Sequence, residues 1–289
     1  MKILHRATFA GALLAVASLV IPVAVAQTPA DAQTPTVLGP PYFDSNVQFL
    51  SGQNVAPSFD GWMQNDDGTF TLVFGYYNRN QREQLVIPPG PNNNLSIGEI
   101  DQGQPTIFAP GRKSWVFMLK VPKDFGDKEV VWTLTAHGQT EKATGKLLRQ
   151  LYITKRLMIS HGNLSPGTDD PNKPPVISIP EAISAKVSKP LPLTAMVTDD
   201  GLPKQFSEKP DEAGGQVNGK IRRVRLTVSW FPYRGPEGVT FDDKGPTDVV
   251  GGRVTTAAHF SAPGTYTLIA VADDTALTTS KTITVNVAE

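Results

Sequence analysis

The chain has 289 residues, with 27 basic side chains, 27 acidic side chains and no cysteine. A chain with balanced charge and no long basic run has no net field that would attract nucleic acid, so we expect no nucleic-acid partner. The missing cysteine excludes disulfides, thiolate metal sites and a cysteine nucleophile. The 25 glycines and 25 prolines favour many turns over long helices.

The first 26 residues have the three parts of a secretory signal peptide. Lys2 and Arg6 supply the positive end, residues 9–21 the apolar core, and Ala24-Val25-Ala26 a small-residue cleavage site. A membrane anchor is the alternative, but the apolar core is short for a bilayer span of about 20 residues. We therefore expect cleavage after Ala26, a periplasmic or secreted protein, and no transmembrane segment in the cleaved chain.

Residues 27–41 are rich in Thr, Pro and Ala, which predicts an extended, disordered linker. A first β-rich domain is expected over residues 42–160. It begins with a hairpin signal, because the Asp67-Gly68 turn joins two alternating segments.

Three segments of this first domain alternate apolar and polar residues: TFTLVFGYYN (69–78), SWVFMLKV (114–121) and EVVWTLTA (129–136). Each predicts a strand with one buried face, and Trp115 is expected on the buried side beside Phe117. PGPNNN (89–94) is expected to be a loop without regular structure, and LLRQLYIT (147–154) a last strand. About seven short strands with turn-rich spacing predict an immunoglobulin-like β-sandwich.

Residues 161–174 are rich in Gly, Pro and Asp, which predicts a short, semi-rigid linker. A second domain, over residues 175–289, is expected to be another β-sandwich. Its clearest strand signals are three runs that alternate with period two: IRRVRLTVSW (221–230), TYTLIAVA (265–272) and TTSKTITVNV (278–287). The polar, Gly-rich segment 204–220 is expected to be a mobile surface insertion.

The second domain resembles the PKD and cadherin-like immunoglobulin-fold repeats of bacterial secreted proteins. The matching residues are Trp230, Gly235, Pro236, Val239, Phe241, Phe260, Pro263, Gly264 and Tyr266, with VTDDGLP (197–203) upstream. The resemblance implies an all-β fold but no single function, because such repeats serve adhesion, spacing, carbohydrate contact and assembly. The first domain is similar to an N-terminal domain of uncharacterised bacterial exported proteins, and this likeness implies no activity.

Two pairs of aspartates follow expected strands of the second domain: Asp199-Asp200 and Asp273-Asp274. Loops at one end of a sandwich can gather, and calcium takes six to eight oxygen ligands, so a calcium site is one hypothesis. Asp169-Asp170 in the linker could join it, as in the interdomain calcium sites of cadherin-like chains. The alternative is that these aspartates only stabilise turns.

Two groups of aromatic residues are candidates for stacking on a sugar: Trp230, Phe231 and Tyr233 in one group, and Tyr76 and Tyr77 in the other. The alternative is a core tryptophan beside a packed surface ring, with Phe231 pointing away from Trp230. A basic row, Arg222, Arg223 and Arg225, could bind an acidic group or could simply keep an exposed strand from pairing.

The sequence contains no HExxH, GxSxG, P-loop or GxGxxG motif. We therefore expect a non-catalytic, exported interaction module of the bacterial envelope that binds a protein or polysaccharide partner, with calcium as the one cofactor that the sequence suggests. A structural or assembly subunit that spaces domains without a ligand is the alternative. A hydrolase is a third hypothesis, which would need paired carboxylates in a cleft.

Overall fold

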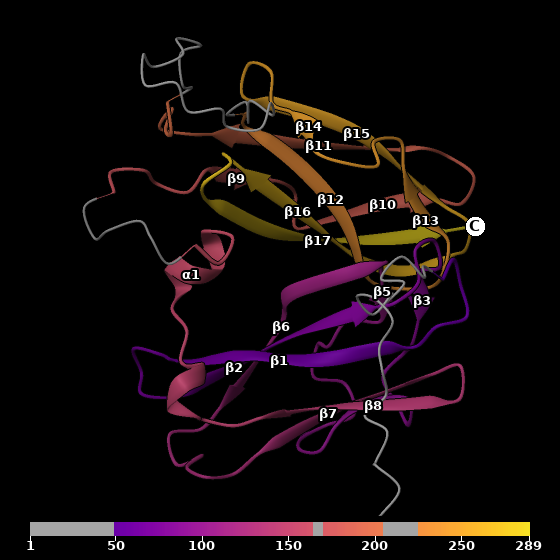
Figure 1. Cartoon of the computed structure of the whole chain (residues 1–289). Coiled ribbons are helices and arrows are strands. Elements are labelled where there is room, and N and C mark those ends of the chain that lie inside the picture. Colours follow the sequence, from indigo (N-terminus) through magenta and orange to yellow (C-terminus); the bar gives the residue numbers. More distant parts are fainter. Residues whose placement is uncertain (1–48, 164–169, 205–224) are drawn as a thin grey trace, which may run out of the picture. The chain divides into compact units, whose positions relative to one another are not determined.

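Strands make up almost all the regular structure in the computed structural model, which describes residues 49–163, 170–204 and 225–289 (Figure 1). Within Gln48–Glu289 the chain packs as one compact unit. None of the helices in the described part is long and apolar enough to cross a membrane. The expected signal peptide, the linker 27–41, nearly all of the insertion, and Arg222 and Arg223 lie outside the described residues.

Two three-stranded sheets and a short ribbon build the first sandwich. One sheet has the order β1-β2-β6, formed by Val55–Gln64, Phe70–Asn78 and Gly111–Val121. The other has the order β4-β7-β8, formed by Asn93–Leu95, Val130–Ala136 and Gln139–Gly145. The ribbon pairs β3 (Leu85–Val86) with β5 (Ile107–Phe108).

The core between these sheets is aromatic. Phe74, Phe117 and Trp132 pack around one another, and both phenylalanine rings lie with centroids 5.9 Å from the Trp132 ring. The predicted alternation in β2 is confirmed, because Leu72, Phe74 and Tyr76 enter this core while Val73 lies in a separate cluster on the other face.

Trp115 is not where the alternation predicts it. It has a φ of 57° and lies at an irregularity of β6, where the register against β2 shifts between Phe74 and Tyr76. Its backbone N–H donates to Asp60 Oδ2 at 2.8 Å instead of continuing the ladder. β6 has two more residues than β2 at this point, and the Trp115 side chain packs against the cluster of Met63 and Val73 instead of beside Phe117.

Two further expectations for this sandwich are wrong. The segment 147–154 is not a strand: it contains a 3-10 helix, Arg149–Leu151, and leads into α1, Lys155–Ile159. Ile153 reaches the sheet through one backbone bond from its N–H to Trp62 O at 2.9 Å, and Thr154 caps α1 through its Oγ1. The PGPNNN stretch also carries regular structure, because β4 begins at Asn93 and pairs with β7.

The second sandwich has the strand order of an immunoglobulin-like domain. One sheet is β9-β11-β15-β13 (Val176–Ser178, Leu191–Thr198, Arg253–Phe260, Val239–Phe241). The other is β10-β17-β16-β12-β14 (Ala182–Lys186, Thr278–Ala288, Gly264–Asp273, Thr227–Arg234, Thr247–Asp248). In chain order these sheets correspond to the ABED and CFG sheets of that fold.

Two side chains mark the same fold locally. Tyr266, near the start of β16, is fully buried and donates from its hydroxyl to Ala262 O at 2.9 Å, as in a tyrosine corner. Trp230 on β12 lies in the core with 8% exposure. The predicted buried faces are confirmed for β16 (Leu268, Ala270) and for β17. The described chain is therefore all-β, with two immunoglobulin-like sandwiches in tandem, as predicted.

Candidate functional site

The two aspartate pairs directly follow strands of the two facing sheets of the second sandwich. Asp199 and Asp200 come after β11, while Asp273 ends β16 and Asp274 follows it. Burial raises the pKa of the Asp199 carboxyl, and the nearby carboxylates of Asp274 and Asp200 raise it further. The loops therefore bring like charges together at one end of the sandwich.

Asp200 and Asp273 use their oxygens within the protein. Asp200 accepts the backbone N–H of Leu202 at 3.0 Å and that of Lys173, in the segment between the sandwiches, at 2.9 Å. Asp273 Oδ1 accepts the N–H of Thr275 at 2.6 Å and lies 3.2 Å from His161 Nε2. These two aspartates thus stabilise turns and hold the connecting segment.

Asp199 and Asp274 each keep one carboxylate oxygen without a partner. Asp274 is only 2% exposed, and its Oδ1 accepts the N–H groups of Ala276 and Leu277 at 2.7 and 2.6 Å. Its Oδ2 is buried and has no hydrogen-bond partner among the described residues, and the same holds for Asp199 Oδ1.

Asn172 adds a third polar side chain of this kind. It is 5% exposed, and neither atom of its amide group has a partner within the described part of the chain. Its neighbour Lys173 is bonded to Asp200, which brings the connecting segment to the end of β11. We call Asn172, Asp199 and Asp274 the oxygen cluster because each carries an unpartnered buried polar atom. Asp274 is near enough to Asp199 to raise the pKa of its carboxyl, and Asn172 precedes the residue that bonds Asp200.

Unpartnered buried polar atoms are costly, about 1–3 kcal/mol each, and commonly mark the site of an ion or a water molecule. The described residues contain no group of three or more His, Cys, Asp or Glu side chains placed to hold a metal. The oxygen cluster differs because an amide supplies its third oxygen. Two carboxylates and one amide carbonyl are hard oxygen donors, which fit calcium better than a softer metal.

Asn172 was missed by sequence reasoning, which pointed to Asp169-Asp170 in the same segment, where Asp169 lies outside the described residues. Asp170 is engaged elsewhere: its Oδ2 pairs with Arg156 at 2.6 Å, and its Oδ1 accepts the Asn172 N–H at 3.0 Å. The only signal in the sequence was an asparagine between Pro171 and Pro174. Such an asparagine by itself indicates only a turn. Its burial depends on contacts far along the chain.

The aromatic candidates of the second sandwich lie in three different environments. Trp230 is in the core, and its Nε1 has no partner among the described residues. Phe231 points to the opposite face, as expected, and is 39% exposed. Tyr233 is mostly covered and donates from its hydroxyl to Gly103 O, in the first sandwich, at 2.8 Å. Of these three rings, Phe231 alone is exposed enough to stack on a ligand.

Tyr76 and Tyr77 also point apart. Tyr76 is 4% exposed, and its hydroxyl accepts the Ala109 N–H at 3.0 Å. Burial raises the pKa of this phenol. Tyr77 is 47% exposed on the other face of β2. Phe231 and Tyr77 thus remain the two candidate contact residues for a partner.

Arg225, the described member of the basic row, is not a free cation. Its guanidinium pairs with Asp248 on the neighbouring strand β14 at 2.5 Å. An exposed pair of this kind contributes little stability but neutralises the charge locally.

No family model matches the chain, and no curated protein matches it.

Its fold is similar to solved tandem domains. Domains 4 and 5 of the S-layer protein SbsC are 10% identical, with 56% of this chain and 66% of that chain covered, and a TM-score of 0.24. A chimeric titin Z1Z2 is 12% identical, with 82% and 99% covered and a TM-score of 0.24. The eight N-terminal immunoglobulin domains of Down Syndrome Cell Adhesion Molecule are 10% identical, with 81% and 27% covered and a TM-score of 0.25. Likenesses this weak carry no argument about function.

Proposed function

We propose that this chain is a non-catalytic, exported interaction module of the bacterial envelope that binds calcium at the oxygen cluster. The single observation that carries the calcium part is the set of unpartnered, buried polar atoms on Asn172, Asp199 and Asp274. A bound cation would supply positive charge between two carboxylates that otherwise repel each other. Calcium needs six or more oxygens, so backbone carbonyls or water molecules would complete its shell.

The residues around the cluster define what calcium would stabilise. Asn172 belongs to the segment between the sandwiches, Asp199 follows β11, and Asp274 follows β16. One cation held by all three would connect this segment to both sheets of the second sandwich. The site is therefore proposed to be structural, with no role in bond cleavage.

Calcium titration of the chelator-treated chain from residue 27 onward tests this part. We expect saturable binding by calorimetry and a rise in melting temperature on addition of calcium, because a ligand that binds only the folded state stabilises it. Asp274→Asn should abolish both effects. Asp243→Asn is the matched control, since Asp243 is an exposed aspartate of the same sandwich. Equal responses from both variants would refute the site.

We propose that the module's partner is a protein or a polysaccharide, bound through the exposed rings of Phe231 and Tyr77. Their exposures of 39% and 47% leave large apolar surfaces in contact with water. The alternative is a structural subunit that spaces domains without a ligand. Capture from an envelope extract, with and without EDTA, separates the two. A specific partner lost from Phe231→Ala and Tyr77→Ala supports binding, whereas recovery of this chain alone supports spacing.

A further inference from the structure

The ribbon of β3 and β5 has one face in each hydrophobic core. Leu85 and Phe108 are paired across the ribbon and pack in the aromatic core of the first sandwich. Val86 and Ile107 are the next pair, and they pack in the core of the second sandwich. Because side chains alternate along a strand, this two-residue ribbon serves both cores at once. Phe108 and Ile107 are 0% and 1% exposed.

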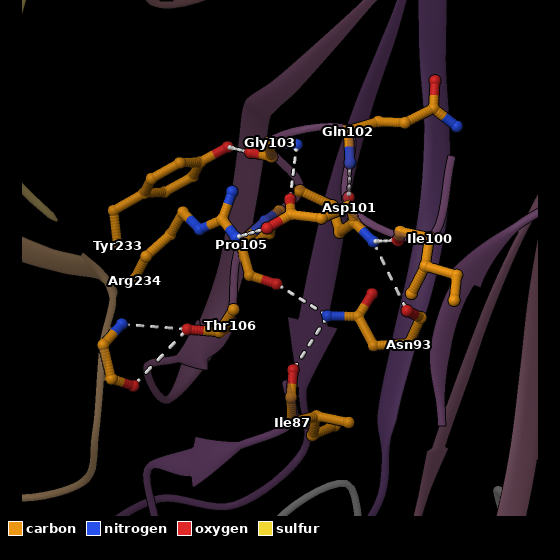
Figure 2. A network of polar contacts seen from close by, with 12 residues as sticks. Ile87, Asn93, Ile100, Asp101, Gln102, Gly103, Pro105, Thr106, Tyr233 and Arg234 are labelled. Carbon is orange, nitrogen blue, oxygen red and sulfur yellow. Dashed lines mark hydrogen bonds and ion pairs between the residues drawn. The ribbon is translucent and has the colours of Figure 1, made fainter. Parts of the chain in front are cut away.

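Backbone and side-chain bonds attach the same segment to strand β12 of the second sandwich (Figure 2). The Thr106 N–H donates to Tyr233 O at 3.1 Å. The Gly235 N–H donates in turn to Thr106 Oγ1 at 3.0 Å. Thr106 is 5% exposed, so these bonds are shielded from water. They extend the main-chain pairing of the first sandwich into the second.

Two side chains of the second sandwich hold the loop that precedes Thr106. Tyr233 donates to Gly103 O at 2.8 Å, and Arg234 pairs with Asp101 Oδ2 at 2.5 Å (Figure 2). The Arg234 guanidinium lowers the pKa of the Asp101 carboxyl, while burial raises the pKa of the Tyr233 phenol.

Asn93 connects this attachment to the first core. Its amide group donates to Ile87 O and Pro105 O, both at 2.8 Å, and accepts from Trp132 Nε1 at 3.0 Å. Figure 2 shows the two bonds to Ile87 and Pro105 beside Thr106. Asn93 is fully buried, so its amide group bonds these protein atoms in place of water. The contacts thus run without a break from Trp132 in one core to β12 beside the other.

We infer that residues 85–108 are a shared part of both sandwiches. The two sandwiches therefore unfold as one cooperative unit and do not move as independent domains joined by a flexible linker. Separate domains of one chain usually share an interface that is more polar than a hydrophobic core, and they move relative to one another. Here a buried residue of the first half, Ile107, completes the core of the second. This inference does not depend on the proposed calcium site.

Native-state hydrogen exchange of the full chain in EDTA tests the inference. The slowest amides of β7 report on the first core, and those of β16 on the second. We expect both sets to exchange by the same global opening in the wild type, with the same dependence on urea. Ile107→Ala should then accelerate both sets together by about 30-fold or more, as expected for truncating a buried isoleucine.

Two further variants keep the test decisive. Thr106→Val replaces the hydroxyl with a methyl group of similar size, so the Gly235 N–H loses its partner. This should accelerate both sets by about 3- to 10-fold, even if Ile107→Ala does not fold. Val250→Ala truncates an apolar side chain that is 77% exposed and should change neither set. If Ile107→Ala or Thr106→Val accelerated amide exchange in β7 alone or in β16 alone, the inference would be overturned. So would different exchange free energies for the two strands in the wild type.

Discussion

The two sandwiches reach stability by different means. The first fills the centre of its core with rings from Phe74, Phe117 and Trp132. The second packs mostly aliphatic side chains, among them Ala195, Ala270 and Val285, around a few rings such as Tyr266. The two cores are therefore filled by different proportions of ring and aliphatic side chains.

Buried polar side chains follow the same division. The first sandwich buries five amide side chains: Asn54, Asn78, Asn80, Asn93 and Gln104. Most of their amide groups bond backbone atoms, as Asn78 does with Glu83 O and Phe108 O at 2.8 and 2.9 Å. By contrast, Asp274 of the second sandwich and Asn172 of the connecting segment are buried polar side chains that retain unpartnered atoms. The buried amides of the first sandwich are bonded within the protein, and these two side chains are not fully bonded among the described residues.

Trp132→Ala should cause the largest loss of stability. Trp132 is fully buried among three rings and donates to Asn93. Truncating such a residue costs about 3–5 kcal/mol, through lost burial and the cavity left behind. Urea denaturation followed by circular dichroism measures the loss. Tyr77→Ala, at an exposed ring, is the control, and similar losses for both would show that the rings do not dominate the first core.

Asn93→Ala should destabilise the chain by about 2–4 kcal/mol, although the residue is polar and lies in a stretch of prolines and asparagines. The substitution leaves Ile87 O, Pro105 O and Trp132 Nε1 without their partner in a dry environment. The same denaturation measurement applies, with Asn94→Ala as a neighbouring control whose amide bonds only loop carbonyls. A loss below about 1 kcal/mol would mean that water replaces the amide.

These two regions also differ in how far the sequence predicts them. Period two along β16 and β17 predicted the buried faces of the second sandwich because nothing interrupts those strands. In the first sandwich, Trp115 and Asn93 could not be placed, since a bulge and a buried amide depend on partners more than 35 residues away in sequence. Local patterns carry no information about such partners.

The candidate site was predictable in part for the same reason. Strand ends placed Asp199 and Asp274 at one end of the sandwich, as loop positions in this fold imply. Which oxygens remain free could not be read from the sequence, because Asp200 and Asp273 are satisfied by Lys173 and Thr275. Asn172 entered the site only through its tertiary burial.

Tyr266→Phe should have a smaller effect, a loss of about 1 kcal/mol, and it acts on the regular sandwich. The change removes the bond to Ala262 O and keeps the ring contact with Phe260, whose centroid is 4.8 Å away. Thermal unfolding should show a lower midpoint with an unchanged fold. Thr240→Val, at an exposed position of β13, is the control. An unchanged midpoint for Tyr266→Phe would mean that the hydroxyl does not hold this corner.

The smallest expected effect is a pH dependence of the free energy of unfolding that comes from Asp199. It should stay under about 1 kcal/mol because this side chain is in partial contact with solvent. Its folded pKa is raised, first by burial and then by the Asp274 and Asp200 carboxylates. The folded state therefore holds this proton more tightly than the unfolded state does. It follows that stability without calcium is highest below the unfolded pKa, about 3.9, and falls as the pH rises through the folded pKa.

Melting temperatures in EDTA between pH 4 and pH 7 measure this fall, and Asp199→Asn should make it shallower because the neutral amide does not titrate. Calcium should oppose the fall in the wild type only, since the cation binds the deprotonated carboxylate. The stabilisation by calcium should therefore be larger at pH 7 than near pH 4. If calcium raised the melting temperature equally at both pH values, Asp199 would not be one of its ligands. The difference in unpartnered polar atoms between the two regions would then bear on calcium binding only through Asn172 and Asp274.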